Sequence, residues 1–167
     1  MYVCPSNVNF INTMIIMKKI IYLVLLSLIT GLVAQAYEKT GEWNGCDRYD
    51  FTFKDRQATI VVPKKAAKGN PWIWRPAFFD AFPSVDKALL EKGFHIVYYD
   101  VTHLYGSPRA VSLGTEFYEN MTDLYNLSEK VTLEGFSRGG LFVFNWAAQN
   151  TEKVACIYVD APVCDVF

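Results

Sequence analysis

The chain has 167 residues, of which 51% are hydrophobic and 16% aromatic. This composition predicts one packed domain and argues against an intrinsically disordered chain. The formal net charge of −1 gives no electrostatic footprint for nucleic acid, so we expect no nucleic-acid partner.

The N-terminal residues predict an upstream segment followed by an export signal. Lys18-Lys19 precedes an apolar run at residues 20–33, and the small-residue pattern Ala-Gln-Ala ends at Ala36. This order is typical of a secretory signal peptide, here Met17–Ala36, and predicts cleavage after Ala36. The run is shorter than the about 20 residues that span a bilayer, with an uncleaved anchor or a buried helix as the alternatives. We expect a secreted or periplasmic protein whose domain covers residues 37–167, with no stable membrane anchor after cleavage.

Strands predominate in the first part of this domain. The alternation in RYDFTFKDRQATIVV predicts an antiparallel hairpin formed by Arg48–Phe53 and Ala58–Val62. A short aromatic strand, Trp72–Arg75, follows a loop. A helix then begins with Ser84 as its N-cap and stops at Gly93.

Strands and helices alternate after that point. The predicted elements are a buried strand at 94–99, a helix at 110–125, a strand at 130–135, a helix from residue 138 and a strand at 153–160. This order predicts an α/β fold, in which a leading antiparallel hairpin joins a mainly parallel sheet with helices on both faces. The chain stops shortly after about the sixth predicted strand.

Export permits disulfides, but the cysteines of the mature chain are odd in number. Cys46, Cys156 and Cys164 remain after signal cleavage, and an odd number leaves at least one thiol unpaired. Cys156 lies in an apolar strand pattern, which predicts a small core residue. No Cys/His spacing is typical of a metal site, and we expect no cofactor.

The segment LEGFSRGG predicts a sharp turn between a strand and a helix around Ser137. Gly135 and Gly139 have no Cβ, so the turn can be tight and the serine is exposed at the carboxyl edge of the sheet. The helix that begins at Arg138 directs free N–H groups towards the hydroxyl. Acyl transfer needs such an arrangement, whereas a glycine-rich turn kept for close packing is the alternative.

This segment resembles the nucleophile elbow of the α/β-hydrolase superfamily. The span Trp72–Asp165 is also similar to secreted bacterial serine hydrolases linked to polysaccharide breakdown. The resemblance implies that Ser137 is the nucleophile and that the backbone N–H of Arg138 is one oxyanion donor. The second donor would follow the strand WIWR; since proline has no N–H, Ala77 is favoured and Arg75 is the alternative.

The partners of the serine are harder to assign. The superfamily order is serine, acid, histidine, yet no histidine follows Ser137. His95 lies in an apolar strand, so we expect it to be a core residue. His103 lies in a loop, and we expect it to have a structural or substrate-contact role. Asp160 ends the last predicted strand and is a candidate acid, although the resemblance implies an acid beyond residue 167. We therefore expect an inactive N-terminal part of a longer enzyme, whose last strand has an unpaired edge.

The resulting hypothesis is a serine hydrolase that acts on carboxylic esters, possible examples being acyl groups on carbohydrates, through an acyl-enzyme. Its expected partner is a small-molecule or carbohydrate ester substrate. A secreted peptidase of the same fold and a non-catalytic binding module on this scaffold are the alternatives. Aromatic residues near the predicted strand ends could stack on sugar rings or fill the core. These residues are Trp72, Trp74, Phe78, Phe79, Tyr98, Tyr99 and Tyr105.

Overall fold

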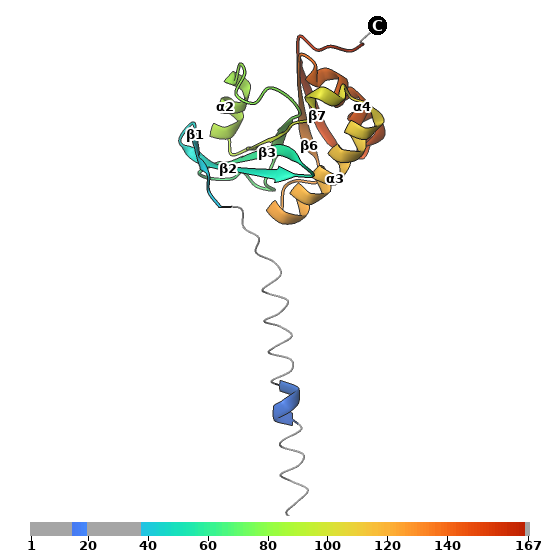
Figure 1. Ribbon diagram of the computed structural model, residues 1–167. Coiled ribbons are helices and arrows are strands. Elements are labelled where there is room, and N and C mark those ends of the chain that lie inside the picture. Colours follow the sequence, from blue (N-terminus) through green and yellow to red (C-terminus); the bar gives the residue numbers. More distant parts are fainter. Residues whose placement is uncertain (1–14, 20–37, 166–167) are drawn as a thin grey trace, which may run out of the picture. The chain divides into compact units, whose positions relative to one another are not determined.

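A computed structural model describes residues 15–19 and 38–165 of the chain (Figure 1). Contacts divide the chain into residues 1–36 and residues 37–167, and residues 15–19 are helical. The apolar run and the cleavage site of the predicted signal peptide lie outside the described residues. Among the helices of the described ranges, none combines the length and the apolar character that crossing a membrane requires.

A single seven-stranded sheet forms the centre of residues 38–165. The strands are β1 (Gly41–Trp43), β2 (Cys46–Phe53), β3 (Arg56–Val62), β4 (Trp72–Arg75), β5 (His95–Tyr99), β6 (Val131–Phe136) and β7 (Val154–Asp160). Their order in the sheet is β1-β2-β3-β5-β4-β6-β7. The pairs from β1 to β5 are antiparallel, and the pairs from β5 through β4 and β6 to β7 are parallel. The predicted hairpin and mainly parallel sheet are confirmed, whereas β1 was not predicted.

The hairpin turn explains the register of β2 and β3. Lys54 and Asp55 connect the two strands, and their φ angles are 48° and 61°. Two consecutive left-handed residues form a type I′ turn, whose twist matches that of the paired strands. Phe53 consequently pairs with Arg56, and Phe51 of β2 reaches the same core as Ala58 and Ile60 of β3.

Helices cover both faces of the sheet, as predicted (Figure 1). The helices are α2 (Ser84–Glu91), α3 (Pro108–Tyr125) and α4 (Gly139–Gln149), with short 3-10 helices η1 (Thr102–Leu104) and η2 (Thr151–Lys153). On one face, Trp74 of β4 packs with Phe117 of α3 and Trp146 of α4. On the other face, Ile73 and its neighbours pack beneath Leu90 of α2. Adjacent residues of β4 thus supply opposite cores, because side chains alternate along a strand.

Two predictions about single residues are wrong. Ser84 is the first residue of α2 rather than its N-cap, because the carbonyl of Pro83 already accepts the first helical hydrogen bond, from the N–H of Lys87 at 3.0 Å. Cys156 is exposed rather than part of the core. Among the described residues β6 is the one strand that pairs with β7, and the side chains of β7 are poorly covered. The unpaired edge predicted for the last strand is present: Ile157 is 38% exposed.

Candidate active site

The strand order marks one edge of the sheet as the place where a ligand would bind. The connection that leaves β4 leads to β5 on one side, while the connection that leaves β6 leads to β7 on the other. In open α/β sheets, ligands bind in the crevice outside the carboxyl ends of strands at such a switch point. Two segments meet there: residues 76–83, which follow β4, and the turn from β6 into α4.

That turn is centred on Ser137, which lies between the end of β6 and the start of α4. Ser137 has a φ angle of 50°, a left-handed conformation that is uncommon for a residue with a side chain. Three backbone hydrogen bonds hold it. Its N–H donates to Asp160 O at 3.1 Å, and its carbonyl accepts from the N–H groups of Gly140 at 3.0 Å and Val163 at 2.8 Å. The side chain is half-buried, so the hydroxyl is outside the packed interior.

Glycines make this sharp bend possible by letting backbones approach. A Cβ on Gly135 would lie 3.1 Å from Gly140 Cα, and one on Gly140 would lie 2.6 Å from Pro162 Cβ. A Cβ on Gly139 would be 3.4 Å from Ala77 Cβ. The sequence pattern indicated the importance of Gly135 and Gly139 but not that of Gly140, which is the most crowded of the three. Its crowding depends on residues 162–163, which return past the turn, and no local pattern predicts that return.

Ala77 and Arg138, the two proposed oxyanion donors, lie beside the turn. Ala77 is buried next to Gly139, and Arg138 is the N-cap of α4. Within residues 38–165, neither backbone N–H donates a hydrogen bond to a protein acceptor. Arg75, the alternative donor, directs its buried side chain to Asp86 instead. The structure therefore brings two uncommitted N–H groups to the neighbourhood of Ser137.

A pocket of about 400 Å³ opens at the same edge of the sheet. It is lined by Gln57, Phe78, Phe79, Tyr98, Asp100, Thr102, His103 and Arg138. These residues follow β4, β5 and β6 or lie near their carboxyl ends, apart from Gln57 of β3. The aromatic residues considered for the cleft thus divide: Phe78, Phe79 and Tyr98 line the pocket, whereas Trp72, Trp74 and Tyr99 are in the core.

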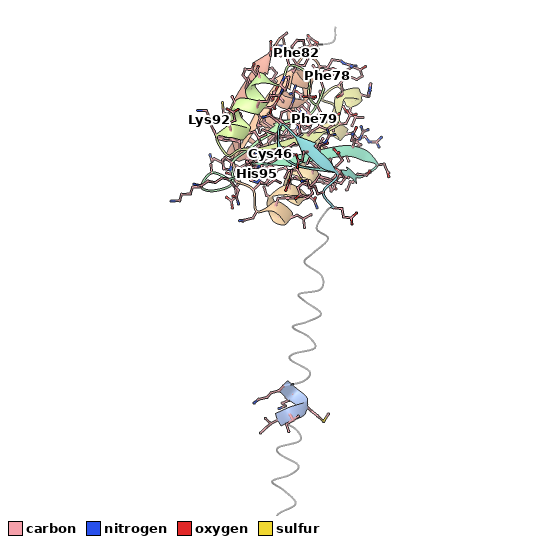
Figure 2. The ribbon with its side chains drawn as sticks, turned by 90° about the vertical axis from the view of Figure 1, so that its left-hand side faces the viewer. Cys46, Phe78, Phe79, Phe82, Lys92 and His95 are labelled. Carbon is pink, nitrogen blue, oxygen red and sulfur yellow. The ribbon has the colours of Figure 1, made fainter. Side chains whose placement is uncertain are left out.

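The candidate partners of Ser137 occupy different places. His103 lines the pocket from η1 and is exposed. His95 is buried at the amino end of β5, where its Nδ1 lies 3.4 Å from Pro71 O and where burial lowers its pKa. Figure 2 shows Phe78 near one end of the domain, with Phe79 nearer its middle and His95 beyond Phe79. Asp160 pairs in register with Phe136, and its side chain is exposed beside the turn.

Solved structures with this architecture place the chain among known folds. The Francisella virulence factor BioJ has a TM-score of 0.55 and 18% identity, over 89% of this chain and 52% of that chain. An esterase from an Arctic intertidal metagenomic library has a TM-score of 0.55 and 11% identity, over 75% of this chain and 65% of that chain. The Aspergillus awamori acetyl xylan esterase has a TM-score of 0.54 and 18% identity, over 67% of this chain and 50% of that chain. The chain has the α/β-hydrolase fold.

The chain spans between 50% and 65% of the length of these three α/β-hydrolase structures. No protein-family model matches the sequence. A comparison with curated proteins also finds no match.

A buried ion cluster lies beneath the candidate site. Arg75 Nη1 donates to Asp86 Oδ2, and Arg75 Nη2 lies 3.4 Å from Glu134 Oε1. The side chains of Arg75, Asp86 and Glu134 are 1%, 1% and 4% exposed. Sequence reasoning missed this cluster, although charged residues inside the apolar strands WIWR and VTLEGF were a usable signal. The cluster joins the end of β4, helix α2 and the strand that leads to Ser137.

Glu134 makes the stability of this domain depend on pH. Burial, reinforced by the nearby carboxylate of Asp86, raises the pKa of Glu134 from 4.5 to about 8. The folded state therefore holds a proton that the unfolded state releases near pH 4.5. The stabilisation is complete below that pH and is lost as the pH rises through about 8.

We expect the free energy of unfolding to fall between pH 7 and pH 8, with a slope of up to about 1.4 kcal/mol per pH unit. Urea titrations at several pH values would measure this slope. Glu134→Gln, which cannot ionise, should lack it. Asp50→Asn should keep it, since the pKa of Asp50 is lowered and this residue titrates only in acid. An equal slope in wild type and Glu134→Gln would contradict the assignment.

Proposed function

We propose that this chain belongs to a serine hydrolase that cleaves carboxylic esters, such as acyl groups on carbohydrates. The observation that carries the proposal is the left-handed φ of 50° at Ser137, in a two-residue turn between β6 and α4. This strained strand-to-helix turn matches the nucleophile elbow, which holds a serine hydroxyl above the sheet. Two of the similar structures are esterases by name, which supports ester hydrolysis.

In the proposed reaction, Ser137 Oγ attacks the ester carbonyl carbon and transfers its proton to a base. The carbonyl oxygen becomes an oxyanion, to which the N–H groups of Arg138 and Ala77 donate. Collapse of this intermediate breaks the ester C–O bond and releases the alcohol, which takes the proton. Water then attacks the acyl-enzyme, and the acid is released from Ser137. A fixed pair of donors needs no reorganisation as charge develops, and removing one such donor typically costs about 10²-fold in kcat.

The base is not assigned to any residue of this sequence. In this fold the acid and the histidine follow the serine along the chain, and no histidine follows Ser137. Asp160 remains the proposed acid, because it ends the strand beside Phe136. A serine hydroxyl without a base is a poor nucleophile at neutral pH. We therefore propose that these 167 residues alone hydrolyse p-nitrophenyl acetate no faster than their Ser137→Ala variant.

Covalent labelling tests the nucleophile. We expect a fluorophosphonate probe to label Ser137 in the longest chain that the gene encodes, and Ser137→Ala to abolish the labelling. Ser112→Ala, at an exposed position on α3, is the matched control and should label normally. Mass spectrometry of the labelled peptide would locate the adduct. Labelling that persists in Ser137→Ala, or its absence from the wild type, would exclude the proposed nucleophile and favour a binding module.

A further inference from the structure

The side chain of Arg138 carries a charge that is held in place but not neutralised. Its guanidinium carbon lies 5.4 Å from the ring centre of Phe78 and 5.8 Å from that of Tyr105. Its Nη1 also donates to Tyr105 Oη at 3.5 Å. Within residues 38–165, no carboxylate forms an ion pair with Arg138. Two aromatic rings therefore orient a cation that keeps its capacity to bind an anion.

The ring beneath this guanidinium belongs to a strained loop. Three residues of loop 76–83 that are not glycine have positive φ angles: Phe78 at 53°, Asp80 at 66° and Phe82 at 50°. Strain of this kind persists only where surrounding contacts enforce it, and it often marks ligand-binding segments. Trp43 Nε1 donates to Asp80 Oδ1 at 2.9 Å, and Arg75 Nη2 donates to Ala81 O at 2.8 Å. These bonds fix the loop, and Figure 2 shows Phe78 and Phe82 together at its end of the domain.

The pocket beside Arg138 contains a single carboxylate, which already has a hydrogen-bond donor. Arg138 and His103 line the pocket together with one carboxylate, that of Asp100. This carboxylate accepts the N–H of Thr102 at 3.1 Å, and the guanidinium of Arg56 donates to the carbonyl of Asp100 at 3.1 Å. Arg138 is thus the one arginine or lysine among the residues that line this pocket. Gln57 contributes a neutral amide that can bind a hydroxyl or a carbonyl.

We propose that the pocket binds a carboxylate group of its ligand through the guanidinium of Arg138, an inference that rests on the proposed function. The substrate is then an ester that carries a free carboxylate, either on a uronic acid residue or on a dicarboxylic acyl group. The planar guanidinium can donate two parallel hydrogen bonds to a carboxylate, which lysine cannot do. Because Arg138 directly follows Ser137, the carboxylate would lie close to the scissile bond.

Ligand titration observed by NMR tests this site without requiring turnover. The probes are methyl β-D-glucuronide with neutral methyl β-D-glucoside, and monomethyl glutarate with dimethyl glutarate. We expect at least one acid to bind about fivefold more tightly than its neutral partner, the size of a half-exposed ion pair. A preference for the glucuronide indicates that the carboxylate belongs to a uronic acid residue, and a preference for monomethyl glutarate indicates that it belongs to the acyl group. No preference in either pair would overturn the proposal.

Variants separate the contribution of the Arg138 guanidinium to this preference from that of the rest of the site. Arg138→Gln should abolish the preference, and Arg138→Lys should retain part of it. Arg109→Gln, an exposed arginine outside this pocket, should leave the preference unchanged. Ser137→Ala should also leave it unchanged, so failure of the nucleophile assignment would be seen in labelling and not in binding. A preference that survives Arg138→Gln would exclude this residue as the anion site.

Discussion

Replacing Arg75 with methionine is expected to lower the free energy of unfolding by about 4 kcal/mol, the cost typical of breaking a buried ion pair. The guanidinium is 1% exposed and bonds to Asp86, which is also 1% exposed. Without it, the carboxylate of Asp86 would be left without its counterion in the interior. Arg75 also binds the carbonyl of Ala81, so the loop that carries Phe78 would lose one of its anchors. Urea unfolding followed by tryptophan fluorescence measures the loss.

Arg48→Met is the matched control for this variant. Arg48 pairs with Asp50 at 2.9 Å, but these side chains are 27% and 32% exposed, so the loss should stay below about 1 kcal/mol. Adding Asp86→Asn to Arg75→Met should recover part of the stability, because it removes the uncompensated charge. Similar losses for Arg75→Met and Arg48→Met would contradict the buried role of Arg75.

Alanine at Gly106 is expected to cost about 3 kcal/mol, the sum of a strained backbone and an overpacked contact. Gly106 has a φ of 67°, and a Cβ there would lie 2.4 Å from Leu141 O and 2.6 Å from Leu141 C. Since these are backbone atoms of α4, rotation of a side chain cannot relieve the clash. The loop between η1 and α3 would move away from α4, and Tyr105 would move with it. Thermal unfolding measures the loss, with the site followed by the NMR signals of Arg138.

Gly69→Ala separates the two contributions at Gly106. Gly69 has a φ of 84°, but no atom lies within 4 Å of the position that a Cβ would occupy there. Its substitution should therefore cost only the backbone component, about 1 kcal/mol. If both alanine variants lose the same stability, the close approach of Gly106 to α4 is not what constrains this position.

Local patterns predicted most of the sheet and helices, because their signals are contained within short segments. The alternation of RYDFTFKDRQATIVV predicted the hairpin, and the apolar run before LEGFSRGG predicted β6. The prediction for Cys156 failed because a strand pattern does not show which strand lies at the edge of the sheet. Residues 41–43 were missed because a three-residue strand is too short to show a period.

For the site, the sequence predicted the position of Ser137 but not what surrounds it. The motif contains Gly135, Ser137 and Gly139, but it does not contain residues 160 and 163, whose backbone groups hold the bend. The ion cluster joins residues 75, 86 and 134, and the cation of Arg138 is oriented by residues 78 and 105, so both depend on tertiary contacts between distant segments. The open question of the second oxyanion donor has a similar origin, since Ala77 meets Gly139 only after β4 and β6 have paired.

The hydrogen bond from Ser137 N–H to Asp160 O ties the bend to β7, a strand at one edge of the sheet. This hydrogen bond holds the bend only while β7 stays paired with β6. Fraying of β7 would let Ser137 relax to an ordinary backbone conformation while the tryptophan-rich core stayed folded. The bend at Ser137 would then be lost before the rest of the domain unfolds, and any segment that pairs with the second edge of β7 would preserve it.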